Sequence, residues 1–330
     1  MRVSIGFNLD IPISAIVDYS KLAESSRFDG IWLHEHSFGR DSVSNITAVS
    51  VSTKRLKLNF GCLSPYVRSP VSLAMSAATL QEASEGRLTL GVGTGFPARL
   101  DLMGITHKYP ISALKETIDI CRLVWSGNPT TYSGKTFAVK NVKSLTGQTK
   151  VKIPIYVAGW KPQMLKLTAK HADGYLAKGG ESTKSIGNIV STIFSYAAKR
   201  PALEIDFAAY LLTMVANTKD EAIAQAKRDP FVAYMLSVQD DYLYEGTGID
   251  PALKKPIAEN YFKGNIAAAF DSIKDEMIDS FTLAGTQDQV GERVREYVKA
   301  GLTQPILQPI SLKQEDVKAV VHAGSRLIGS

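Results

Sequence analysis

Short apolar runs alternate with helix-length amphipathic segments along most of the 330 residues. Apolar runs with few charges are typical of parallel strands that are buried on both faces. We expect eight strands, at 3–7, 30–33, 56–62, 88–92, 153–157, 174–177, 207–215 and 305–308. Helical spacing occupies the segments 14–28, 41–53, 70–84, 112–125, 163–171, 183–199, 287–300 and 314–327. This alternation predicts an α/β fold of the (β/α)8 TIM-barrel type, with insertions.

The clearest strand–helix–strand unit lies between Leu56 and Gly95. Its helix is expected to begin at Ser69-Pro70, an N-cap followed by an N1 proline, and to end at Gly86. The second strand runs into the loop G-V-G-T-G at 91–95, where glycines let the backbone approach a flat or anionic ligand. A dinucleotide fingerprint is rejected, because Phe96 replaces its third glycine and Pro97 follows instead of a helix.

Two segments are expected to be insertions in the plain (β/α)8 barrel. Residues 128–151 alternate polar and apolar side chains around Ser133-Gly134, which predicts a hairpin. Residues 229–280 are rich in tyrosine and then helical, and they could cap the mouth of the barrel. Because no linker divides the chain, we expect a single domain over residues 1–330, with insertions at about 128–151 and 229–280.

The charge balance excludes some partners. The net charge is +6, but lysines and arginines are scattered and no aromatic-basic platform is present, so nucleic-acid binding is not expected. Mild basicity suits an anionic small ligand. Cys62 and Cys121 lie in apolar element interiors, which favours a reduced compartment. With no signal-peptide pattern and no long apolar run, we expect a cytoplasmic protein that does not bind membranes.

Polar residues at the strand ends are the candidates for chemistry, because barrel enzymes act at this face. The first strand ends at Asn8, and the second ends in the sequence W-L-H-E-H. Alternation places His34 and His36 on one face and Glu35 on the other. The cluster is a metal pair, an acid/base histidine oriented by a carboxylate, or ordinary polar residues. A metal is not expected, because the remaining histidines lie outside strand ends, at His107, His171 and His322.

Two glycine-bearing turns directly precede predicted helices. They contain Gly159 and Lys178-Gly179-Gly180. Backbone N–H groups and the positive helix end would converge there on a phosphate, unless the glycines only close tight loops. Arg68, before an earlier helix, is either a clamp for a phosphate or carboxylate or a solvated arginine.

Several stretches together resemble the bacterial-luciferase-like superfamily of flavin and deazaflavin oxidoreductases. They are NFGCLSPYVRSPVSLAMSAATLQEASEGRLTLGVGTG, WLHEH, RLVWSGNPTTYSGKTF and KIPIYVAGWKPQMLKLTAKHADGYLAKGG. The likeness is to the deazaflavin branch, above all to methylenetetrahydromethanopterin reductase, and it thins over residues 229–280. The resemblance implies a barrel, usually a homodimer, that binds a flavin-type ring at the carboxyl ends of its strands.

The resemblance also assigns residues. Gly61-Cys62 matches the family's non-prolyl cis peptide, and His36 with Glu35 matches its acid–histidine pair. The loop residues Gly93, Thr94 and Gly95 match positions beside the cofactor. Gly159, Lys178, Gly179 and Gly180 match the turns that hold its phosphate.

Two positions depart from the family pattern. Gly6 stands where the methanopterin reductase has a glutamate, and Phe96 stands where the deazaflavin-dependent sugar-phosphate dehydrogenase has one. His36 is therefore the remaining candidate acid/base.

We expect an oxidoreductase that transfers hydride between coenzyme F-420 (8-hydroxy-5-deazaflavin) and an organic small-molecule substrate. The alternatives are an FMN-dependent monooxygenase of the same superfamily, a non-catalytic flavin-binding relative and a zinc hydrolase.

Overall fold

The computed structural model describes residues 1–8, 10–36, 38–197 and 205–328. Eight parallel strands close into a barrel, and each predicted strand is confirmed. The barrel strands are β1 (Ser4–Phe7), β2 (Gly30–Leu33), β3 (Lys57–Phe60), β4 (Leu88–Val92), β7 (Ile155–Ala158), β8 (Gly174–Ala177), β9 (Asp206–Val215) and β11 (Gln304–Pro309). Neighbours pair in that order, and β11 returns to β1 to close the ring, with Ser4 opposite Ile306.

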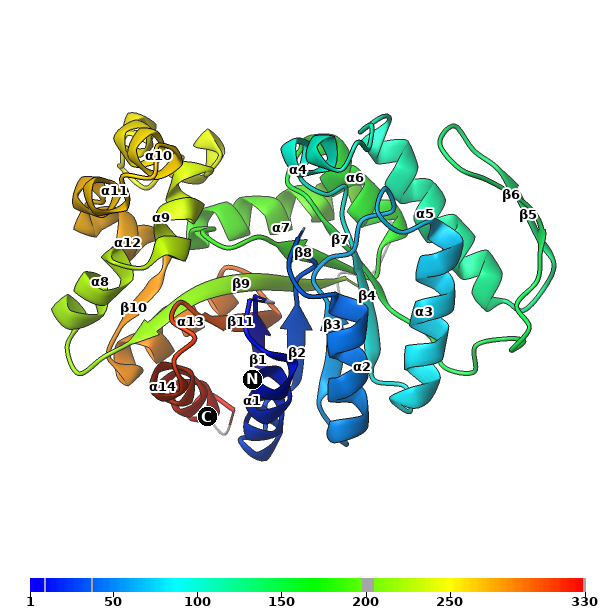
Figure 1. The fold of residues 1–330 in the computed structure, drawn as a ribbon, viewed down its shortest axis with the longest axis horizontal. Coiled ribbons are helices and arrows are strands. Elements are labelled where there is room, and N and C mark those ends of the chain that lie inside the picture. Colours follow the sequence, from blue (N-terminus) through cyan, green and yellow to red (C-terminus); the bar gives the residue numbers. More distant parts are fainter. Residues whose placement is uncertain (9, 37, 198–204, 329–330) are drawn as a thin grey trace.

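Helices surround the barrel at the predicted places (Figure 1). They are α1 (Ile13–Ser25), α2 (Ser42–Ser52), α3 (Pro70–Ala83), α5 (Pro110–Trp125), α6 (Pro162–His171), α7 (Thr183–Ala197), α13 (Gln287–Lys299) and α14 (Gln314–Ser325). The Ser69 side chain caps α3 by accepting from the Ser72 N–H, as the sequence predicts. The end of the expected helix at 198–199 lies outside the described residues.

Strand side chains point alternately inward and outward. Ile31 and Leu33 belong to the core between β2 and the helices, whereas Trp32 points into the barrel. A small interior cluster fills the barrel itself: Trp32, Tyr156, Leu176, Ala208, Tyr210 and Ile306. Packing against the helices on one side and this cluster on the other explains why the strands contain continuous apolar runs.

The predicted hairpin is confirmed as β5 (Thr130–Ser133) and β6 (Ala138–Val142), an antiparallel pair. It projects from the side of the barrel in Figure 1. The buried Glu116 carboxylate of α5 anchors its turn by accepting backbone N–H groups from Lys135, Thr136 and Phe137, at 2.7 to 2.9 Å. One carboxylate therefore satisfies three donors that the turn leaves unpaired.

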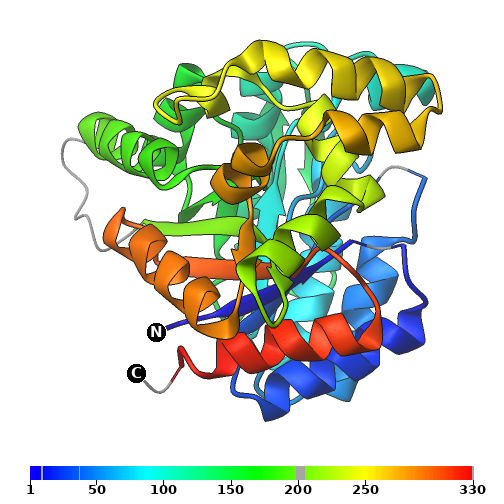
Figure 2. The same ribbon diagram turned by 90° about the vertical axis from the view of Figure 1, so that its left-hand side faces the viewer.

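A second insertion follows β9 and begins earlier than expected, at Lys219 instead of Asp229. It contains α8 (Lys219–Lys227), α9 (Pro230–Ser237), the 3₁₀ turns η2 (Asp241–Tyr244) and η3 (Pro251–Leu253), α10 (Lys254–Phe262), α11 (Ile266–Ser272) and α12 (Asp275–Phe281). The strand β10 (Leu283–Gly285) ends it by pairing with the last residues of β9. Figure 2 shows α10 and α11, in yellow and gold, on the side of the molecule away from α1 and α14.

Two further findings complete the fold. The segment after the glycine loop is a short helix, α4 (Pro97–Leu102), so the expectation that Pro97 replaces a helix is wrong. Proline suits the first helical position because its missing N–H is unpaired there in any case. No helix in the described parts of the chain is both long and apolar enough to cross a membrane.

Candidate active site at the carboxyl end of the barrel

The three polar residues after β2 have three different partners. His34 lies inside the barrel mouth, where its ring stacks on Tyr210 at a centroid distance of 4.0 Å. Its Nε2 is 3.3 Å from the amide oxygen of Gln308, at the end of β11. Burial lowers the pKa of His34 to about 4, so the imidazole is neutral at physiological pH. A neutral, stacked histidine serves here as a packing and hydrogen-bonding group.

Gln308 links His34 to the end of β1. Its amide Nε2 donates to Oδ1 of Asn8 at 3.3 Å. Asn8, which the sequence singles out as the polar residue of this strand end, therefore lies at the mouth and half-buried. The amide of Gln308 joins the exits of β1 and β2.

Glu35 points to Arg68, in the loop before α3. Nε of Arg68 donates to the Glu35 carboxylate at 2.7 Å, and a second guanidinium nitrogen pairs with Asp41. Two carboxylates of the chain thus pair with Arg68, so the interpretation as a solvated arginine is wrong, and the ligand clamp stays a prediction. The Glu35 carboxylate is also 3.5 Å from the backbone nitrogen of Ser64. Glu35 therefore connects the β2 exit to the β3 exit.

His36 is in contact with Arg99 of α4. Nη1 of Arg99 lies 2.8 Å from Nε2 of His36, and Nη2 donates to the hydroxyl of Tyr234 at 3.0 Å. Since a guanidinium only donates hydrogen bonds, the imidazole nitrogen accepts this one and the ring is neutral in this arrangement. Tyr234 belongs to α9, so this contact joins the barrel mouth to the second insertion.

A cis peptide bond joins Gly61 and Cys62 directly after β3, as the resemblance implies. The hydroxyl of Tyr210 donates to the Gly61 carbonyl at 3.0 Å. A Cβ at Gly61 would lie 1.9 Å from that hydroxyl oxygen, so no other residue fits. Burial raises the pKa of the Cys62 thiol to about 12, which keeps it protonated.

The glycine loop after β4 packs on this bend. A Cβ at Gly93 would lie 2.4 Å from Sγ of Cys62, so glycine is required for the close approach. The carbonyl of Thr94 accepts from the Ser64 hydroxyl at 3.2 Å. The exits of β3 and β4 thus pack closely against each other, and this approach requires glycine at Gly93.

The two predicted phosphate turns lie at the exits of β7 and β8. Gly159 and Gly180 both have positive φ, 137° and 88°, a conformation that favours glycine. They precede α6 and α7, whose positive ends lie near these turns. Lys178 is between them, and its ammonium pairs with Asp240 of the second insertion.

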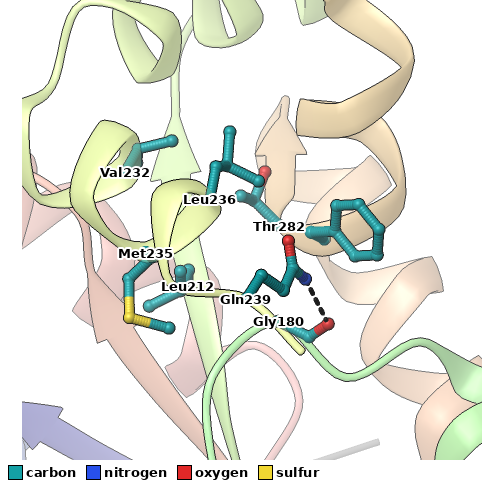
Figure 3. A pocket seen from close by; sticks show the side chains of 8 residues that line it. Gly180, Leu212, Val232, Met235, Leu236, Gln239 and Thr282 are labelled. Atoms are coloured by element: carbon teal, nitrogen blue, oxygen red, sulfur yellow. Dashed lines mark hydrogen bonds between the residues drawn. The ribbon is translucent and has the colours of Figure 1, made fainter. Parts of the chain in front are cut away.

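The second insertion is bound to the β8 turn through further contacts. Gln239 donates from Nε2 to the Gly180 carbonyl at 3.4 Å, beside a small apolar pocket (Figure 3). Figure 3 shows Val232, Met235 and Leu236 of α9 around it, together with Leu212 of β9. This contact places the end of α9 against the predicted phosphate turn.

Aromatic side chains extend this contact. The rings of Trp160 and Tyr242 stack at a centroid distance of 4.1 Å, and the Lys178 ammonium lies 5.5 Å from the Tyr242 ring. The Tyr242 hydroxyl also donates to Glu181. Burial raises the pKa of the Glu181 carboxyl, although the hydroxyls of Ser185 and Tyr242 oppose the shift.

The arrangement fits a flavin-type cofactor with a phosphate. Glycine backbone at the β3 and β4 exits lets a planar ring approach closely, and two glycine turns ahead of helices suit an anion. Gly61, Cys62, Gly93 and Thr94 would contact the ring, and Gly159, Gly179 and Gly180 would hold the phosphate. Among the described residues, no group of three or more His, Cys, Asp and Glu side chains is placed to hold a metal ion.

Five residues of this site do not follow from the sequence pattern: Arg99, Tyr210, Tyr234, Asp240 and Gln308. Arg99 had a usable signal, since Pro97 marks the start of the helix that carries it, and so did Gln308, the last residue of a predicted strand. Each of the others depends on contacts between segments that are far apart in the chain.

Comparison with known proteins agrees with this architecture. The family model described as luciferase-like monooxygenase matches residues 3–304. The 5,10-methylenetetrahydromethanopterin reductase of Methanolobus tindarius is 33% identical over 333 aligned positions and 100% of both chains. The enzyme of that name from Archaeoglobus fulgidus is 32% identical over 93% of this chain and 92% of its own.

Among solved structures, the coenzyme F-420-dependent tetrahydromethanopterin reductase of Methanopyrus kandleri superposes with a TM-score of 0.88. The two chains are 28% identical, and the match covers 100% of this chain and 99% of the other. Both the matched family model and the relatives that share its full length lead to one conclusion: this chain belongs to the luciferase-like monooxygenase family.

Proposed function

We propose that this protein is an oxidoreductase that transfers hydride between coenzyme F-420 and an organic small molecule. One observation carries the proposal: closely packed glycine backbone at the β3 and β4 exits lies on the same barrel face as two glycine turns ahead of helices at β7 and β8. A planar ring with a phosphate-bearing tail matches this layout. The solved coenzyme F-420-dependent tetrahydromethanopterin reductase of Methanopyrus kandleri, which matches over the whole chain, supports the choice of cofactor.

The bound cofactor would supply the hydride chemistry, and the residues of the chain would position the reactants. We assign His36 the acid/base role, because it lies at the mouth and its imidazole has a ring nitrogen that accepts a hydrogen bond, here from Arg99. Glu35 becomes a positioning residue, since its carboxylate faces Arg68 and the Ser64 backbone. Lys178 is the candidate phosphate ligand once it leaves Asp240.

Residue 6 marks a difference between this site and a site that carries a carboxylate at the same position. A Cβ at Gly6 would lie 2.8 Å from the ring of Tyr210 and 2.9 Å from the side chain of Ile306. Tyr210 therefore fills the space that a glutamate at this position would need. The assignment of His36 as the acid/base rests partly on this exclusion.

We further propose a cytoplasmic homodimer of single-domain chains that does not bind nucleic acid. Support for the dimer comes from α2 and α3, where α2 carries no charged residue and α3 carries only Glu82. Val51 on α2 and Met75 on α3 are 69% and 62% exposed. Sedimentation equilibrium tests this, and a monomer at micromolar concentration would contradict it.

Titration of the purified protein with coenzyme F-420 and with FMN tests the cofactor. We expect micromolar or tighter binding of the deazaflavin and much weaker binding of FMN, followed by absorbance and fluorescence. Since the family model is named for monooxygenases, the opposite preference would favour FMN-dependent oxygen chemistry. Binding of neither cofactor would contradict both functions.

A further inference from the structure

Among the residues that the structure describes, Arg99 has no counter-ion at the mouth of the barrel. It is half-buried on α4, and its guanidinium carbon lies 5.7 Å from the centroid of the Tyr234 ring. Its two hydrogen-bonding partners, His36 and Tyr234, are both neutral. No carboxylate of the described residues forms an ion pair with it.

Two other cations of the mouth, Arg68 and Lys178, are arranged differently. Arg68 is held between Glu35 and Asp41, and Lys178 pairs with Asp240. A partly buried charge is costly unless a charge of opposite sign accompanies it. The chain supplies this partner at the two neighbouring sites and omits it at Arg99, which leaves N–H groups of the guanidinium available beside His36.

We propose that Arg99 receives an anionic oxygen of the substrate, so that the enzyme acts on a carbonyl or carboxylate compound instead of a cationic iminium. The inference rests on the proposed function and names its substrate class. A cationic substrate carbon beside Arg99 and neutral His36 would be repelled, whereas an oxygen that is or becomes negative would complete the ion pair.

The chemistry of a carbonyl substrate balances with the reactants named. The carbonyl carbon gains a hydride from reduced 5-deazaflavin, which is thereby oxidised. The C=O π bond breaks and its electron pair moves to oxygen, where the guanidinium of Arg99 stabilises the charge. The oxygen then takes one proton through His36, whose imidazole takes up a proton from water in the same step. A substrate carboxylate would instead bind Arg99 unchanged and orient the reacting carbon.

The first test needs no cofactor. Acetate is titrated into the apo protein, and the His36 imidazole is followed by NMR with labelled histidine. We expect saturable shifts that Arg99→Gln weakens by roughly tenfold or more, the effect of one charge-assisted hydrogen bond. Arg99→Lys should restore part of the affinity. Arg228→Gln is the matched control, because Arg228 lies on the outer surface of the insertion and pairs with Asp271.

Tyr234→Phe separates this role from a purely structural one. It removes the contact that ties Arg99 to α9 but keeps the charge, so acetate affinity should stay within about twofold. Equal acetate binding by the wild type and Arg99→Gln would overturn the proposal. The proposal would also be overturned if Arg99→Gln lost thermal stability and nothing else. Failure of deazaflavin binding, by contrast, would contradict the proposed function and leave the acetate result valid.

Turnover distinguishes the two sources of the oxygen anion. With reduced F-420 and pyruvate or acetone as acceptors, an increase in KM for pyruvate alone identifies a carboxylate contact. A lower kcat for both acceptors identifies the oxygen formed by hydride transfer. Either result supports the proposal, and unchanged kcat and KM in Arg99→Gln would contradict it.

Discussion

The imidazole of His34 stacks on the phenol ring of Tyr210, with centroids 4.0 Å apart and planes inclined by 25°. The same tyrosine donates its hydroxyl to the carbonyl of Gly61. One side chain on β9 therefore supports both the exit of β2 and the bend after β3. The candidate site depends on this central ring, which lies inside the barrel.

Tyr210→Phe should lower the free energy of unfolding by about 1 to 3 kcal/mol, because the buried Gly61 carbonyl loses its donor. Urea denaturation measures this loss. Tyr19→Phe is the control, since the Tyr19 hydroxyl makes a similar bond to the Leu312 carbonyl at a partly exposed place. An equal loss in both variants would contradict a special role for Tyr210.

His34 should make stability depend on pH. Its folded pKa of about 4 lies below the ordinary 6.5, so the unfolded chain binds the proton more readily. The stabilisation that neutral His34 contributes to the folded state is complete above pH 6.5. It is lost as the pH falls towards 4, which lowers the free energy of unfolding by about 3 kcal/mol at most. His34→Phe keeps a ring for stacking and should show a smaller fall in this window. If the free energy of unfolding falls with pH in the same way in the wild type and in His34→Phe, the prediction is refuted.

His36→Ala should reduce turnover by roughly 10² or more if His36 is the acid/base. Stopped-flow absorbance of F-420 oxidation gives kcat and KM separately. The expected change is in kcat, because the group acts in the transition state. If only KM rises, His36 is a binding residue.

Asp240→Asn should tighten the binding of F-420 by roughly two- to fivefold, because the phosphate no longer competes with a carboxylate for Lys178. Fluorescence titration at several salt concentrations measures the affinity. Asp241→Asn is a matched control, since Asp241 pairs with Lys254 instead. Weaker binding by Asp240→Asn would show that the phosphate does not use Lys178.

Glu116→Gln should destabilise the β5–β6 hairpin, because an amide group replaces an oxygen that accepts backbone N–H groups. We expect a loss of about 1.5 to 3 kcal/mol in urea denaturation. Hydrogen exchange at Lys135 and Phe137 should also accelerate. Glu82→Gln on the exposed side of α3 is the control and should change little. Unchanged exchange in the hairpin would contradict the anchoring role.

The sequence by itself determined the barrel. Apolar runs such as Leu88–Val92 are recognisable as doubly buried strands, and caps such as Ser69-Pro70 mark helix starts, because both signals are local. The resemblance added the cis bond at Gly61-Cys62, which no local pattern announces. Strand ends then indicated where His36 and the glycine turns lie, since all parallel strands end at one face of a barrel.

Only the tertiary structure decided which side chains meet at that face. Adjacent residues Glu35 and His36 turn to different arginines, Arg68 in the loop before α3 and Arg99 on α4. Lys178 meets Asp240, which lies 62 positions away in the chain. The Lys178–Asp240 pair depends on how the second insertion docks on the barrel, and all three pairings are contacts between distant segments. The spacing of residues along a chain carries no information about contacts of that kind, and so the unpaired charge of Arg99 emerges only in the folded molecule.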